Sequence, residues 1–339
     1  NATCVLNFDH ATGYLVGEEN QGMRYMFTIM NAARLVVGLQ GLCLAQAALQ
    51  SSMDYATERV QMRALKGPVA PEKPADPIIV HPDVRRMLLT QRAIAEGGRA
   101  LIYYTAQAAD RFLHGEAAER ERAGSLLDFL TPIVKGMLTE LGFESVNEAV
   151  QVYGGHGFIR ETGIEQHVRD ARITLIYEGT TQIQALDLLG RKILMTQGKG
   201  LLIFLEEINR VTETLREPLP ELAAALAATA DEWGQLTLEL SASAQQDMDA
   251  LGAAAVDYLF YSGYAALAYC WARVAETAWR AQQRHRRDAS EDDPYLAGKL
   301  ATARFYFSRL LPRKDFHKQA IEAGPDSLVQ VSDDALTAL

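Results

Sequence analysis

Cysteine is scarce in this chain, because only Cys4, Cys43 and Cys270 occur among its 339 residues. Three scattered cysteines cannot form the disulfide framework of a small secreted domain or a cysteine-based zinc site. The seven histidines include no i, i+4 pair and no mixed cluster with cysteine, so we expect no metal site. This cysteine usage suits a reducing compartment, and we expect a cytoplasmic protein.

Positive charge is scarce as well, since 33 Lys and Arg stand against 43 Asp and Glu, which leaves a formal net charge of −10. A surface of that sign repels phosphate backbones, so nucleic acid is not expected as a partner. Long hydrophobic runs are also missing. The most apolar window, residues 253–272, is interrupted by Asp257, Ser262 and Gly263, which favours a buried bundle helix over a membrane span.

Most of the sequence after Gly22 is predicted to be helical, because apolar residues recur there at helical spacing. Pro82 suits the first turn of one helix, and Gly142 is expected to cap the end of another. Several long helices with short connections indicate antiparallel packing. The expected helices cover residues 23–30, 32–62, 82–114 and 116–141, and then residues 198–214, 219–243, 248–283 and 293–323.

A β-hairpin is expected in front of the helices, because residues 3–8 and 14–16 read as two short strands around a turn. A lone hairpin is marginally stable in water, so it reads as the remnant of a larger sheet. We therefore predict an all-α chain with a remnant hairpin. Its three parts would be residues 1–22 (hairpin and linker), 23–197 (a four-helix bundle) and 198–339 (a second helical domain).

The clearest candidate chemistry lies between Gln151 and Lys192. Its first part holds a cluster of glycines, which let a backbone approach a ligand closely. Its second part is an apolar, extended run, residues 173–177, that ends at Glu178 ahead of a helix that Thr180 or Thr181 could cap. A carboxylate at such a bend suits a general base, although an ordinary acid near a helix N-terminus gives the same pattern.

Two arginines add to this picture. Arg34 is the single charge in A-A-R-L-V-V-G-L, and a buried arginine needs an anion, which is either a carboxylate of another helix or a ligand. Arg59 follows Glu58 at the end of its helix, where it either complements the helix dipole or holds a phosphate. The two alternatives stay open for each arginine on the pattern alone.

Taken in order, Asn31-x-x-Arg34, Glu58-Arg59, Q-V-Y-G-G-H-G-F and I-Y-E-G-T-T-Q-I-Q resemble the helical C-terminal domain of the flavin-dependent acyl-CoA dehydrogenases. The likeness covers about residues 5–194, and the tail resembles the longer bacterial branch, which carries an extra C-terminal helical domain. The resemblance implies FAD as the cofactor and an acyl-CoA thioester as the substrate. Glu178 would take the α-proton while the β-hydride leaves for flavin N5.

The same resemblance assigns the remaining site residues. Thr180 and Gln182 would contact the adenine-dinucleotide part of the flavin. The FAD of a neighbouring subunit would be contacted by Arg59, Gln151, Gly154 and Gly155. The substrate would be contacted by Asn31, Arg34, Tyr177 and Gly179. Asn31 stands where better-known members carry Asp, and Met62 stands where an aromatic residue is usual.

The resemblance further implies that electrons pass to an electron-transfer flavoprotein. A homodimer is expected, which the rows of small residues on the bundle helices also favour. In this family the flavin ring lies between a β-domain and the helical domain, so we expect residues 1–339 alone to bind FAD weakly or not at all and to show no turnover. An acyl-CoA oxidase and a non-catalytic helical scaffold are the alternatives, and the intact Y-E-G-T-T-Q motif counts against the scaffold.

Overall fold

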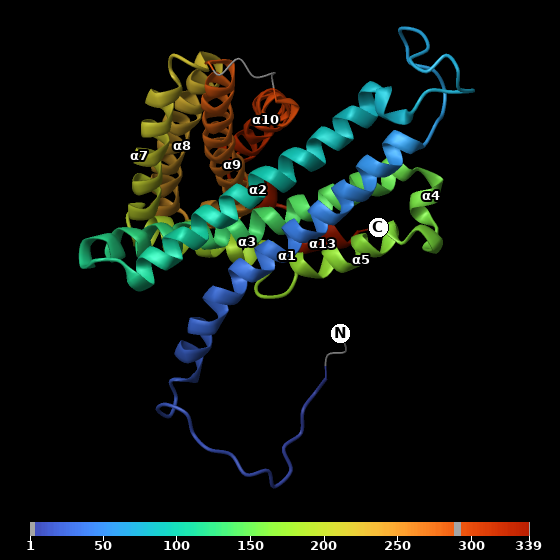
Figure 1. Ribbon diagram of the computed structural model, residues 1–339. Helices are drawn as coiled ribbons and strands as arrows, with labels where there is room; N and C mark the ends of the chain where they lie inside the picture. Colours follow the sequence, from blue (N-terminus) through green and yellow to red (C-terminus); the bar gives the residue numbers. More distant parts are fainter. Residues whose placement is uncertain (1–3, 288–292, 339) are drawn as a thin grey trace.

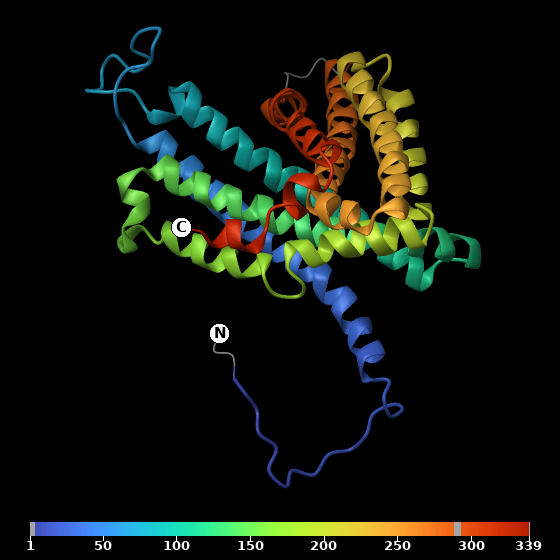
Figure 2. The same cartoon turned by 180° about the vertical axis from the view of Figure 1, so that it is seen from behind.

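The computed structural model describes residues 4–287 and 293–338, and the regular structure in that part of the chain is helical (Figure 1). A single isolated β-bridge between Val60 and Pro77 is the exception there. The all-α prediction is therefore confirmed. The hairpin is not: Thr3 lies outside the described residues, and residues 4–16 form no strand but an exposed arm that leads away from the helices (Figures 1 and 2). Two short strands without further sheet partners are not stable.

Three long helices form the first part of the molecule: α1 (Gly22–Glu58), α2 (Pro82–His114) and α3 (Ala117–Tyr153). They lie side by side, and shorter elements complete the bundle along α3 (Figure 1). Those elements are α4 (Gly155–Phe158), α5 (Ile164–Arg172), the 3₁₀ turn η3 (Ile173–Leu175), α6 (Thr181–Leu186) and the π-helical stretch η4 (Asp187–Met195). The expected bounds of residues 82–114 agree with α2, whereas the two helices expected before residue 62 are one continuous helix.

Gly142 does not cap a helix but lies inside α3, at the point where α3 crosses α1. A Cβ added at Gly142 would lie 2.6 Å from the carbonyl oxygen of Gly41, and one added at Gly41 would lie 2.7 Å from that of Leu138. The two backbones therefore touch, because neither glycine places a side chain between them. The small residues of α1 serve packing within the chain, so they give no support to a partner subunit.

The second part of the molecule begins with long helices that stand across one end of the bundle and ends with a short helix farther along the bundle, toward α5 (Figures 1 and 2). It consists of α7 (Lys199–Leu215), α8 (Pro220–Gln246), α9 (Met248–Arg287), α10 (Pro294–Phe305), the π-helical stretch η5 (Tyr306–Leu310), α11 (Arg313–Glu322), α12 (Asp326–Val329) and α13 (Asp333–Thr337). Residues 261–272 of α9 are buried without interruption, as expected for a bundle helix.

One hydrophobic core runs through both parts, and α3 is shared between them. Close glycine contacts mark the junction. A Cβ added at Gly136 of α3 would lie 2.5 Å from a methyl carbon of Leu259, and one added at Gly263 of α9 would lie 2.4 Å from Met137. The helices of the second part therefore pack directly against α3 rather than hanging from a linker.

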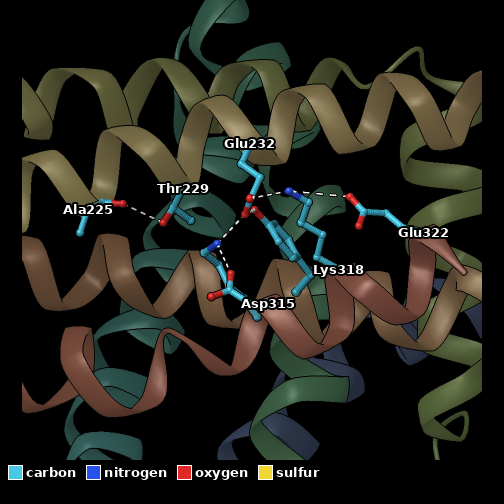
Figure 3. Close-up of polar contacts among 8 residues, drawn as sticks. Ala225, Thr229, Glu232, Asp315, Lys318 and Glu322 are labelled. Carbon is cyan, nitrogen blue, oxygen red and sulfur yellow. Dashed lines mark hydrogen bonds and ion pairs between the residues drawn. The ribbon is translucent and has the colours of Figure 1, made fainter.

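A polar cluster joins three helices of the second part around Glu232 of α8 (Figure 3). Lys314 and Lys318 of α11 donate to its carboxylate, the latter at 2.8 Å, and Tyr261 of α9 donates at 2.7 Å. Burial pushes the pKa of Glu232 upward, but these three hydrogen bonds outweigh it and lower the pKa to about 2.

Among the described helices, α1 has the length and apolar composition that a membrane span requires, and 44% of its most apolar window is buried in the molecule. A core helix of a water-soluble bundle meets the same two criteria. In this molecule α1 packs against α2 and α3.

Candidate active site

Glu178 lies at a sharp corner between η3 and α6. Its backbone φ is +58°, and that of Gly179 is +92°. The left-handed conformation is uncommon for a residue with a side chain and costs on the order of 1–3 kcal/mol, so the surroundings must hold it. The extended run expected before Glu178 is wrong. The N–H groups of Ile176 and Tyr177 both donate to the carbonyl of Ile173, at 3.0 and 3.2 Å, which coils this segment tightly.

Two kinds of contact hold the corner: the N-terminal cap of α6, and hydrogen bonds from two buried side chains. Thr180, rather than Thr181, caps α6 by accepting from the N–H of Ile183 at 3.3 Å. Gln184, which is fully buried, donates to the carbonyl of Glu178 at 3.1 Å. Lys135 of α3 donates to the carbonyl of Gly179 at 2.6 Å. Both carbonyls of the strained segment therefore have a buried side-chain donor.

The carboxylate of Glu178 is incompletely satisfied. Its Oε2 atom is buried and has no hydrogen-bond partner in residues 4–287 and 293–338. A buried carboxylate oxygen normally has a donor, so an orphan of this kind requires an explanation. The neighbouring side chains of Ile176, Tyr177 and Ile183 are partly exposed and mostly apolar. A carboxylate beside exposed apolar side chains suits a ligand with two features: an apolar chain that the side chains can cover, and a C–H proton that the carboxylate can remove.

Arg34 reaches the same region from α1 but is engaged by the protein. Its Nη1 atom lies 3.1 Å from Oδ2 of Asp187, and both side chains are 6% exposed. Of the two alternatives for Arg34, the carboxylate of another element is the one present. Asn31 is exposed one turn earlier on α1. Contact of either residue with a substrate stays a prediction, as it does for Tyr177, whose hydroxyl donates to Gln40, and for Gly179.

A second set of predicted residues meets at the far end of α3. Arg59, Gln151, Gly154 and Gly155 all line one cavity of about 450 Å³, together with Met62. Gly154 has a φ of +60°, and a Cβ added at Gly155 would meet no atom within 4 Å. Unlike Gly142, Gly155 is therefore not needed for packing within the chain. An arginine beside bare backbone in a cavity of this size suits the phosphate part of a dinucleotide, so these residues fit FAD.

The two sets are far apart on a single helix. Lys135 lies under the Glu178 corner and Gln151 lies at the cavity, which places them about 24 Å apart at 1.5 Å of rise per residue. Thr180 and Gln182, both exposed, are on the Glu178 side. The predicted cofactor residues thus form two groups at separate places.

Sequence reasoning missed two buried charged residues, Lys135, which donates to the corner, and Asp187, which pairs with Arg34. Each is the single charge in an apolar segment, L-T-P-I-V-K-G-M-L and A-L-D-L-L-G. The same signal singled out Arg34 and would have found both. Gln184 and Glu140, whose carboxylate accepts from Thr181 at 2.6 Å, carry no comparable signal.

Comparisons with known proteins show the family to which the chain belongs. The family model described as "Acyl-CoA dehydrogenase, C-terminal domain" matches residues 20–194, and that described as "Acetyl-CoA dehydrogenase C-terminal like" matches residues 204–332. The chain is 41% identical to a 3-methylmercaptopropionyl-CoA dehydrogenase of Ruegeria pomeroyi, over 97% of this chain and 55% of that protein. It is 33% identical to a broad-specificity linear acyl-CoA dehydrogenase of Mycobacterium tuberculosis, over 99% and 57%. The chain thus spans little more than half the length of these relatives.

Two solved structures share the fold. One is ACDH-11 of Caenorhabditis elegans in complex with C11-CoA, with a TM-score of 0.69 and 21% identity over 87% of this chain and 46% of that one. The other is an acyl-CoA dehydrogenase of Bacillus anthracis complexed with FAD, with a TM-score of 0.68 and 20% identity over 90% and 50%. At these identities the likeness concerns the fold alone.

Proposed function

We propose, since this chain belongs to the acyl-CoA dehydrogenase family, that it is the C-terminal portion of an FAD-dependent enzyme that desaturates an acyl-CoA thioester. The reaction removes a proton from the α-carbon and a hydride from the β-carbon. The names of the relatives support linear acyl-CoA thioesters, 3-methylmercaptopropionyl-CoA among them, as the substrate class. The second helical part, residues 198–339, completes the long form of the family.

In this proposal Glu178 is the general base. Its carboxylate, whose buried Oε2 atom has no donor, receives the α-proton, and its backbone N–H holds the thioester oxygen, on which negative charge develops as the proton leaves. Tyr177 and Gly179 line the acyl chain, and Asn31 and Arg34 lie at the thioester opening. Bound FAD supplies the acceptor of the β-hydride. An electron-transfer flavoprotein is the proposed acceptor of electrons from the whole enzyme.

The two groups of cofactor residues support a homodimer. Thr180 and Gln182 would contact the flavin cofactor that Glu178 faces. Because the cavity of Arg59, Gln151, Gly154 and Gly155 lies about 24 Å away along α3, we assign it to the FAD of the partner subunit. Each active site then needs both chains. We also propose a cytoplasmic location, in line with three cysteines that form no disulfide.

The observation that carries this proposal is the orphaned carboxylate oxygen of Glu178, held at a strained corner by buried donors. A helical scaffold without chemistry would have no use for such a corner. In the full-length enzyme, we expect Glu178→Gln to abolish exchange of the substrate α-proton with solvent while acyl-CoA binding is retained. Glu161→Gln, an exposed acid on η2 (Arg160–Thr162), is the control. Exchange at the wild-type rate in Glu178→Gln would refute the proposal.

A further inference from the structure

We propose that Lys135 is a positioning residue for Glu178, because its buried side chain donates to the carbonyl of Gly179 and so holds the strained Glu178–Gly179 corner in place. This inference rests on the proposed role of Glu178 as the base. It concerns a residue that no motif of the sequence singled out, in the middle of the shared helix α3.

The burial of Lys135 is unusual for a lysine. The residue is 0% exposed, and its single hydrogen bond goes to the carbonyl of Gly179 at 2.6 Å. No carboxylate in the part of the chain that the structure describes forms a direct ion pair with it. Fully buried lysines are rare because losing water disfavours the charge, and here burial lowers the pKa of Lys135 to about 8. A methionine would fill the same space without that penalty.

The charged groups around Lys135 come from three elements. After burial, the attraction of Glu140 raises the pKa of Lys135, the repulsion of Arg34 lowers it, and the attraction of Glu178 raises it. Arg34 is already paired with Asp187, and Glu140 accepts a hydrogen bond from Thr181. Of the charges that face the ammonium group, Glu178 is thus the one that has a buried oxygen without a donor.

The contribution of Lys135 is geometric. Glu178 holds a φ of +58°, a left-handed conformation that is strained for a residue with a side chain and relaxes when its support is removed. Lys135 supports the Gly179 carbonyl, and Gln184 supports the Glu178 carbonyl. A shift of about 1 Å in a reacting group can slow an enzyme roughly a hundredfold, so the loss of one support affects the chemistry.

The experiment uses the full-length enzyme with FAD bound and compares Lys135→Met, Lys135→Gln and Lys135→Arg. The rate of flavin reduction by an acyl-CoA is measured anaerobically by rapid mixing as a function of acyl-CoA concentration. Lys135→Arg keeps a long, charged hydrogen-bond donor, so we expect a rate within about threefold of wild type. Lys135→Met should lower the maximal rate roughly 10- to 100-fold, while the acyl-CoA concentration that gives half of that rate stays within about threefold of wild type.

Two further variants make the result decisive. Lys299→Met removes a lysine of α10 that is 15% exposed and paired with Glu96 of α2, and it should leave both the rate and its dependence on acyl-CoA concentration unchanged. If Lys135→Met fails to retain FAD, Lys135→Gln, whose shorter side chain carries the donor less far, should still lower the maximal rate. A wild-type maximal rate in the FAD-bound uncharged variants, or a loss that appears only as weaker acyl-CoA binding, overturns the inference. An active Glu178→Gln enzyme would instead overturn the proposed function, so the two failures are distinguishable.

Discussion

Replacing Gly142 by alanine tests how tightly α1 and α3 are packed. The new Cβ would lie 2.6 Å from the carbonyl oxygen and 2.9 Å from the carbonyl carbon of Gly41, and both are backbone atoms that no rotamer change can move. The helices must therefore separate by several tenths of an ångström along their crossing. Overpacking of this kind costs about 1–3 kcal/mol, and alanine returns up to about 1 kcal/mol through its higher helix propensity. We expect a net loss of about 1–2 kcal/mol.

Gly252 provides a matched control, because it lies in α9 with nothing within 4 Å of an added Cβ. Gly252→Ala gains the helix propensity without the clash, so it should leave stability unchanged or raise it by up to about 1 kcal/mol. Thermal unfolding of the full-length protein, followed by circular dichroism, measures both variants. The midpoint should fall by a few degrees for Gly142→Ala and not for Gly252→Ala. A Gly142→Ala protein as stable as Gly252→Ala would refute the backbone contact.

Three other substitutions test separate parts of the structure. Asp187→Asn leaves the charge of Arg34 buried and unpaired, which should cost about 3–5 kcal/mol in denaturant unfolding, and replacing both residues by leucine should recover most of it. Glu232→Gln should cost about 1–2 kcal/mol near neutral pH. Because folding lowers the pKa of Glu232 from 4.5 to about 2, its contribution is present above that ordinary value and lost as the pH falls between the two, so acid titration should bring wild type and variant together. Gly155→Leu should change stability by less than about 0.5 kcal/mol, because a Cβ there meets no atom, but should weaken FAD retention at least roughly tenfold as its side chain fills the cavity. Unaltered flavin content in Gly155→Leu would remove this cavity from the FAD assignment.

Local signals account for the parts of the fold that the sequence predicted well. The start of α2 at Pro82 follows from a residue that suits the first helical turn, and the apolar repeat carries the helix to His114. Gly142 shows where such signals fail. A glycine after a helical run looks the same whether it caps the helix or meets another backbone, and only Gly41, far earlier in the chain, distinguishes the two. The prediction of a hairpin failed for a related reason, because a segment with a strand-like pattern forms a stable strand only when other strands pair with it.

The candidate site was likewise predicted only in part from the sequence. Glu178 and the residues of the glycine cavity lie in compact motifs, so a resemblance to a family located them. Lys135 acts on a backbone carbonyl of a residue distant in sequence, and no pattern of side chains encodes such a contact. The strain at Glu178 was equally invisible, since glutamate is not a residue that marks a left-handed turn. Folding brings these two features together, and the proposed chemistry depends on both.

The glycine contacts at the junction of the two helical parts have an evolutionary consequence. Gly136 makes room for Leu259, and Gly263 makes room for Met137, so the surface of each part is shaped to fit a side chain of the other. A recombination event that exchanged the second part for a foreign one would leave either a groove or a collision at these positions. Mutations on α3 and α9 must therefore be accepted in compensating pairs, and the two parts are inherited as one unit. Among homologues of the long form, these four positions should covary.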